Sequence, residues 1–178
     1  MRYEWFESWC GFSLFRIESL AFAMLAPLLF ASPSWTADSS LTVTSQVSHT
    51  EAILMGLYFR TPQLGWAVGS GGTILKTVDG GKKWKKVASG TVASLSAVFF
   101  FDEKQGWVVG ANGTIRRSQD GGNTWQQQLV DTQVPFYGLS FVSASEGWVV
   151  GGNGTILHTK DGGIHWGDQA SKTSAALY

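Results

Sequence analysis

Three aspartates, Asp79, Asp120 and Asp161, stand 41 residues apart along the chain. A carboxylate is a common acid or base in enzymes, so these residues are the first candidates for chemistry. Each of them, however, lies in a copy of the same repeated sequence. A catalytic carboxylate occurs once in a chain, whereas a turn-forming aspartate can recur in every repeat, where it accepts hydrogen bonds from the amides that follow it. The repetition therefore favours a structural role for all three.

The residues around each aspartate fit the form [ST]-x-D-x-G-x-x-W, as in "TVDGGKKW", "SQDGGNTW" and "TKDGGIHW". The glycines supply backbone conformations that are closed to other residues. We expect the tryptophan to open the next strand and to bury its ring over the turn. The predicted turn residues are Asp79, Gly81 and Trp84; Asp120, Gly122 and Trp125; and Asp161, Gly163 and Trp166.

The segments that must position these turns repeat with the same period. Each unit begins with an aromatic and branched run that is typical of a strand, and a glycine-flanked run such as "GWVVG" predicts a second, buried strand. Asn112-Gly113 and Asn153-Gly154 indicate tight hairpin turns before a third strand, and a fourth follows the aspartate turn. The predicted strands cover 53–59, 94–100 and 135–141, then 65–69, 106–110 and 147–151, then 73–77, 114–118 and 155–159. Four antiparallel strands in about 40 residues make one blade of a β-propeller.

The fold class predicted is therefore all-β, with three 41-residue blades at about 53–88, 94–129 and 135–169. Because the aspartate turn, or Asp-box, recurs in triplicate with "GWxVGxxGTI", the chain resembles the propeller family of photosystem II stability and assembly factors. That resemblance implies a seven-bladed propeller without a cofactor. It also implies an exported, non-catalytic scaffold that helps to assemble a membrane protein complex, with a photosystem II subunit as partner in a photosynthetic host.

Three blades are fewer than the seven that the resemblance implies, and each blade needs neighbours to cover its apolar faces. In the repeat register "SKTSAALY" aligns with "SGTVASLS" at 89–96, so residues 170–178 are interpreted as the start of a truncated fourth unit. The alternative is a homodimer in which two chains contribute three blades each to one ring and so cover both open edges.

An enzyme is the competing hypothesis, because Asp-box turns also occur in sialidases and other glycoside hydrolases. Sialidase-like chemistry would need clustered arginines, a tyrosine nucleophile with a partner, and an acid. A carbohydrate-binding propeller is the other form of this alternative. The repeats contain only Arg60, Arg116 and Arg117, and the last two are adjacent on a strand, so they face opposite sides. Tyr58 and Tyr137 lie in first strands, where we expect them to pack in the core. We therefore predict no catalysis.

The basic run "KKWKK" is interpreted first as solvated charge on an outer strand, and it is the candidate surface if the chain binds an acidic protein partner. Its candidate residues are Lys82, Lys83, Lys85, Lys86, Arg116 and Arg117. A formal net charge of zero leaves no footprint for nucleic acid. His158 and His165 could approach each other across a hairpin, but two imidazoles without a third ligand do not predict a metal site.

The first 37 residues are expected to be a leader, followed by a linker over residues 38–52. An apolar run from Leu20 to Phe30 is typical of a signal peptide and short for a membrane span. The sequence thus predicts export to the periplasm or thylakoid lumen, with an uncleaved membrane anchor as the alternative. The single cysteine, Cys10, lies in this leader, so the repeats can form no disulfide among themselves.

Overall fold

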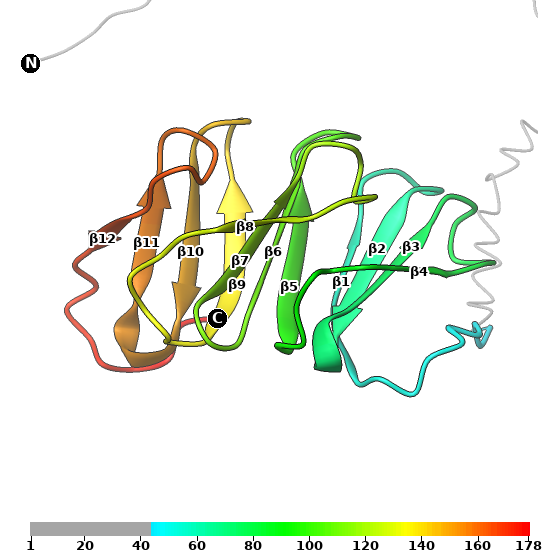
Figure 1. The fold of residues 1–178 in the computed structure, drawn as a ribbon, viewed down its shortest axis with the longest axis horizontal. Helices are drawn as coiled ribbons and strands as arrows, with labels where there is room; N and C mark the ends of the chain where they lie inside the picture. The colour runs from blue at the N-terminus through cyan, green and yellow to red at the C-terminus, as the bar shows by residue number, and fades with distance from the viewer. Residues whose placement is uncertain (1–43) are drawn as a thin grey trace, which may run out of the picture. The chain divides into compact units, whose positions relative to one another are not determined.

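The computed structural model describes residues 44–178, so the predicted leader and the first part of the linker lie outside the described residues. The described chain forms twelve strands in three four-stranded antiparallel sheets, and each sheet follows chain order from its first strand to its fourth. In Figure 1 the three sheets stand side by side, with the second in the middle. The all-β propeller class predicted from the repeat is confirmed.

Each sheet is one blade, and its strands agree with the predicted ones to within one residue at each end. Blade 1 contains β1 (Leu54–Phe59), β2 (Gly65–Gly69), β3 (Thr73–Thr77) and β4 (Lys85–Val87). Blade 2 contains β5 (Leu95–Phe100), β6 (Gly106–Gly110), β7 (Thr114–Ser118) and β8 (Gln126–Gln128). Blade 3 contains β9 (Phe136–Phe141), β10 (Gly147–Gly151), β11 (Ile156–Thr159) and β12 (Gly167–Gln169).

The hairpin between the second and third strands has the left-handed geometry that the sequence predicted. Asn112 and Asn153 have φ values of 55° and 54°, and the glycine after each also has a positive φ. In blades 1 and 3 the residues at the equivalent repeat positions form short 3₁₀ turns, η1 (Ser70–Gly72) and η2 (Gly152–Gly154). Asparagine and glycine tolerate this region better than other residues, so the turn is encoded locally.

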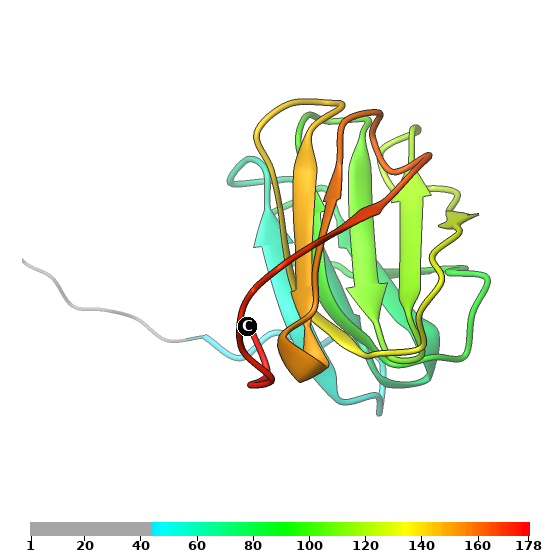
Figure 2. The same cartoon turned by 90° about the vertical axis from the view of Figure 1, so that its left-hand side faces the viewer.

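The apolar cores lie between neighbouring sheets. One core contains Trp66, Val98, Phe100 and Trp125 and joins blades 1 and 2; the other contains Phe136 and joins blades 2 and 3. Figure 2 shows the same sheets turned by 90°. Because each sheet is covered only where a neighbour lies against it, burial depends on the place of the blade in the row.

The first strands of the blades illustrate this dependence. Leu57 in β1 is 64% exposed, whereas Val98, which occupies the same repeat position in β5, is 7% exposed. Val98 packs against blade 1, and no other blade among residues 44–178 covers Leu57 in the same way. Within the described part of the chain, no helix is long and apolar enough to cross a membrane.

Candidate functional site

The aspartate turns are held by hydrogen bonds that begin and end within the turn. In blade 2, Asp120 Oδ1 accepts the backbone N–H groups of Asn123 and Thr124, each at 2.9 Å. Its second oxygen accepts the Thr124 hydroxyl at 2.7 Å. In the other two turns the aspartate accepts the backbone N–H of Lys83 or His165, also at 2.9 Å. Each carboxylate is therefore occupied by its own turn.

The serine or threonine two residues before the aspartate has a role that sequence reasoning missed. The Ser118 hydroxyl donates to Asp120 Oδ1 at 2.8 Å and accepts the Gly122 N–H at 2.8 Å. Ser118 is 1% exposed, so this hydroxyl is the main partner available to the buried amide. Thr77 and Thr159 make the same two bonds in the other turns. The sequence feature that could have revealed this role is the serine or threonine at this position in all three copies.

These bonds lower the pKa of the turn carboxylates. Burial alone would raise the pKa of Asp120, but hydrogen bonds from Thr124, Ser118 and the Asn123 amide outweigh it and hold the pKa at about 2. The pKa of Asp161 is lowered by the backbone amide of His165, against the opposing effect of burial. The pKa of Asp79 is lowered in the same way by the amide of Lys83. A carboxylate with a lowered pKa stays ionised near neutral pH and is a poor general acid.

The turn glycines adopt the left-handed backbone that the sequence predicted, with φ values of 85° at Gly81, 82° at Gly122 and 95° at Gly163. They also allow a close approach between blades. A Cβ on Gly122 would lie 2.5 Å from the indole nitrogen of Trp66 in blade 1. A glycine is therefore needed there both for its backbone angle and for the lack of a side chain.

The turn tryptophans lie immediately before the fourth strands rather than within them. Trp125 is 7% exposed and meets the Phe100 ring edge to face, with centroids 5.8 Å apart. Trp84 and Trp166 are half-buried and meet Phe59 and Phe141 in the same T-shaped way. The expected burial of the ring is complete only in blade 2.

The structure places the two predicted arginines in internal contacts, on opposite sides of β7. Arg116 is 8% exposed and donates to the carbonyl of Gly90 at 2.6 Å and to that of Trp125 at 3.3 Å. Arg117 donates to Gln105 Oε1 at 2.9 Å and lies over the Trp107 ring, 5.6 Å from its centroid. Both guanidinium groups therefore have partners within the fold, and their contact with a protein partner stays a prediction.

The lysines, in contrast, line a groove of about 540 Å³ beside β4. Lys83, Lys85 and Lys86 lie on its walls with the Trp84 ring, whereas the exposed Lys82 does not line it. Sequence reasoning missed Lys76 on β3, whose Nζ donates to Asn123 Oδ1 of blade 2 at 3.1 Å. Burial lowers the pKa of Lys76. The groove thus combines an aromatic ring with four lysines and one carboxylate residue, Asp79, so positive charge predominates on its walls.

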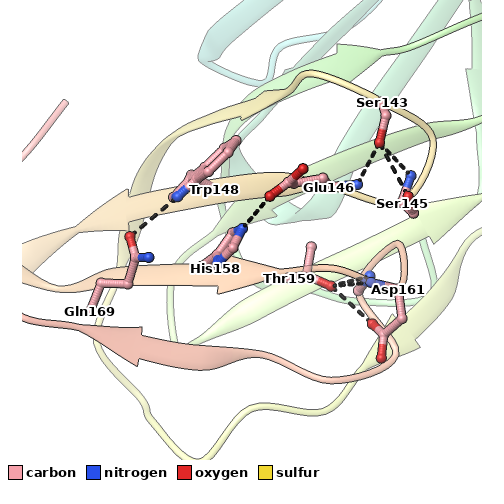
Figure 3. Close-up of polar contacts among 9 residues, drawn as sticks. Ser143, Ser145, Glu146, Trp148, His158, Thr159, Asp161 and Gln169 are labelled. Atoms are coloured by element: carbon pink, nitrogen blue, oxygen red, sulfur yellow. Dashed lines mark hydrogen bonds and ion pairs between the residues drawn. The ribbon is translucent and has the colours of Figure 1, made fainter.

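The two histidines of blade 3 have separate carboxylate partners. His158 Nε2 lies 3.1 Å from Glu146 Oε1, and its ring stacks on Trp148 with centroids 4.5 Å apart (Figure 3). His165 Nδ1 lies 2.7 Å from Asp161 Oδ2. No group of three metal-binding side chains occurs among residues 44–178. The histidine pairs are therefore explained without a metal.

The residues considered for glycoside hydrolysis do not come together as a catalytic set. Arg60 is exposed after β1, and the partners of Arg116 and Arg117 are described above. Tyr58 packs against the core and donates its hydroxyl to the Phe100 carbonyl at 2.8 Å. Tyr137 is only half-buried and stacks on Tyr178. Tyr58 therefore packs as predicted, whereas Tyr137 lies at the edge of the core.

Comparison with known proteins relates the chain to one family. The family model "Photosynthesis system II assembly factor YCF48" matches residues 83–174, just over half of the 178 residues. No curated protein sequence matches the chain. The family match covers the end of blade 1, all of blade 2 and all of blade 3.

Solved structures agree with that match. The structure described as YCF48 bound to D1 peptide is 27% identical, with a TM-score of 0.61, and the alignment covers 67% of this chain and 41% of that one. YCF48 from Cyanidioschyzon merolae is 29% identical, with a TM-score of 0.62, and the coverage is 70% and 42%. The chain thus spans about two fifths of the length of these relatives.

A more distant likeness is to an ancestral GH74 enzyme, at 14% identity and a TM-score of 0.52, over 64% of this chain and 18% of that one. At that identity the likeness concerns the fold alone, because one propeller architecture carries many unrelated functions.

Proposed function

Because the chain belongs to the YCF48 family of photosystem II assembly factors, we propose that it is a protein-binding scaffold that assists the assembly of a membrane protein complex without catalysing a reaction. Its partner in a photosynthetic host would be a photosystem II subunit. The observation that carries the proposal is the similarity to a YCF48 structure solved with D1 peptide bound.

The lysine-lined groove beside β4 is the proposed contact surface. Lys83, Lys85 and Lys86 bring positive charge to a groove that also contains the Trp84 ring. An acidic peptide segment could place carboxylates near the lysines and apolar atoms on the ring. Because such exposed charges are screened by salt, the contact should weaken as the ionic strength rises.

The test is the binding of a fluorescent D1 peptide to the purified full chain, followed by anisotropy. We expect the double variant Lys85→Glu with Lys86→Glu to bind about tenfold more weakly, which corresponds to about 1.4 kcal/mol. Lys160→Glu is the matched control, because Lys160 is an exposed lysine of blade 3 away from the groove. It should bind like the unchanged chain.

Three results would count against this proposal. If the unchanged chain does not bind the peptide, the assembly role in its photosystem form fails. If the peptide binds equally well to both charge-reversed proteins, the groove is not the contact surface. Turnover of a fluorogenic sialoside by the purified chain, lost on changing Arg60, would favour the hydrolase instead.

Export is part of the same proposal and rests on the apolar run in the predicted leader. The chain would then act on the periplasmic or lumenal side of a membrane. Cell fractionation with an antibody against the repeats tests this location, and N-terminal sequencing of the recovered protein distinguishes a cleaved leader from an anchor. Recovery of the protein only from the cytoplasm would contradict export.

A further inference from the structure

The contact between neighbouring blades is built twice from the same parts. Trp66 of β2 stacks on Phe100 of blade 2, with centroids 3.5 Å apart and planes 9° apart, and its indole N–H donates to the Gly121 carbonyl at 3.2 Å. One repeat later, Trp107 stacks on Phe141 at 3.6 Å and 12° and donates to Gly162 at 3.0 Å. We name this arrangement the Trp–Phe–Gly joint. One blade supplies the tryptophan, and the next supplies the phenylalanine and the turn carbonyl.

Blade 3 carries the tryptophan half of a further joint. Trp148 stands at the repeat position of Trp66 and Trp107, and it is only half-buried. Its indole N–H donates to the side chain of Gln169 in its own blade at 3.2 Å, as Figure 3 shows. His158 lies against the Trp148 ring, in the same position that Arg117 takes against the Trp107 ring. The donor therefore has a substitute partner within the blade.

Blade 1 carries the complementary half. Phe59 stands at the repeat position of Phe100 and Phe141 and is 38% exposed. The Gly80 carbonyl, equivalent to those of Gly121 and Gly162, accepts the amide of Gln46 at 3.4 Å in an exposed contact. A Cβ on Gly81 would meet that Gln46 side chain, as one on Gly122 would meet Trp66. The Gln46 amide thus takes the place of an indole N–H, at a longer distance.

We propose that two copies of the chain dock head to tail through this joint. Trp148 of one copy stacks on Phe59 of the other and donates its N–H to the Gly80 carbonyl, from which it displaces Gln46. A second copy is the occupant argued for, because the Trp148 face and the Phe59 face, which no other blade among residues 44–178 covers, are the two halves of a joint that the chain already forms twice. The joint would also cover Leu54, Met55 and Leu57, which are 41%, 47% and 64% exposed.

The proposal goes beyond a binding scaffold, since it gives the scaffold a defined assembly. The interface joins two different faces, so it is heterologous, and two copies form it twice when the rotation between them closes a ring of six blades. His158 would then lie next to the incoming aspartate turn, as Lys76 lies next to Asn123.

The last residues of the chain occupy one end of the tryptophan face. The Leu177 N–H donates to the Gly151 carbonyl at 2.9 Å, and Tyr178 stacks on Tyr137 with centroids 4.9 Å apart. In the repeat register these two residues correspond to Leu54 and Met55 at the start of β1. Residues 171–178 therefore compete with the incoming strand and have to leave the face when a second copy docks.

The experiment is light scattering after gel filtration of the full chain, over a range of concentrations. We expect a dimer, and we expect Trp148→Ala and Phe59→Ala each to weaken the dimer about tenfold or more. Leu129→Ala is the control, because Leu129 is 83% exposed and follows β8, away from both faces. Far-UV circular dichroism of each variant establishes that it is folded.

Mixing the variants separates this joint from other interfaces. The Phe59→Ala chain keeps an intact Trp148 face, and the Trp148→Ala chain keeps an intact Phe59 face, so a mixed dimer contains one intact joint. An equimolar mixture should therefore dimerise more tightly than either variant alone. Deletion of residues 171–178 should favour the dimer by removing the competitor.

Four outcomes would overturn the proposal: a monomeric unchanged chain, a dimer that both alanine variants retain, a mixture that stays monomeric, or loss of the dimer on deletion of residues 171–178. If Trp148→Ala does not fold, Phe59→Ala on the opposite face still decides, because Phe59 is partly exposed and its loss should leave blade 3 intact. A folded Phe59→Ala chain that dimerises as tightly as the unchanged chain refutes the joint.

Discussion

Gly122 provides a direct test of the packing between blades. One added methyl group there should cost free energy twice, once through the backbone conformation and once through overlap with the neighbouring blade. Its φ is 82°, and a Cβ there would lie 2.5 Å from Trp66 Nε1 and 3.1 Å from Phe100 Cζ. An alanine in left-handed backbone costs about 1–2 kcal/mol. Forcing an extra carbon into a packed core costs about 1–3 kcal/mol more. Gly122→Ala should therefore lower the free energy of unfolding by about 2–5 kcal/mol.

Gly71 is the matched control. Its φ is 63°, so the backbone cost is similar, but a Cβ there would meet no atom within 4 Å. Gly71→Ala should therefore cost only about 1–2 kcal/mol. The measurement is guanidinium unfolding of both variants, followed by tryptophan fluorescence and circular dichroism.

The joint predicts that Gly122→Ala loses more free energy of unfolding than Gly71→Ala. Combining Gly122→Ala with Trp66→Phe removes Trp66 Nε1, the nearest atom that the methyl group would meet, so the double variant should lose less free energy than the sum of the single changes. Equal losses at Gly122 and Gly71, or strict additivity in the double variant, would refute the reasoning that the joint requires this glycine.

Three further predictions concern single contacts. Trp107→Phe leaves the buried Gly162 carbonyl without its indole partner and should lower the free energy of unfolding by about 1–3 kcal/mol, measured by denaturant titration; an unchanged midpoint would contradict it. Asp120 has a folded pKa of about 2, below the usual value of about 3.9, so its stabilisation is present above about pH 4 and is lost as the pH falls through about 2; Asp120→Asn should flatten that part of a plot of melting temperature against pH. Arg116→Ala leaves the buried carbonyl of Trp125 without its guanidinium partner and should lower the melting temperature, whereas an unchanged melting temperature would indicate that this contact contributes nothing.

Much of the fold could be predicted from the sequence, because the repeat is specified by local chemistry. The Asp120 carboxylate and the Gly122 backbone are satisfied within one turn of a few residues. Hairpin residues such as Asn112 select their own backbone angles. Such short-range requirements appear in the sequence as particular residue types at a fixed spacing. The occurrence of this motif in three copies also predicted the family.

The candidate site could be predicted only in part. The lysines around Trp84 were visible as a charged run, but Lys76 and Asn123 join them from another strand and another blade. Arg116 was assigned to the same patch, since sequence alone does not tell a buried guanidinium from an exposed one. Its partner Gly90 lies in the segment between blades 1 and 2.

The sequence by itself determined the unit: four strands, a hydroxyl and aspartate turn, and a tryptophan at a set place in each copy. Only the tertiary structure decided what each copy does, because burial and pairing come from the neighbouring blade. Trp107 donates across a blade contact, whereas its repeat equivalent Trp148 bonds within its own blade. Likewise Val98 is buried and Leu57 is exposed at one repeat position. Residues at equivalent repeat positions therefore differ in how much they stabilise the fold, because the surface that buries them belongs to a distant part of the chain.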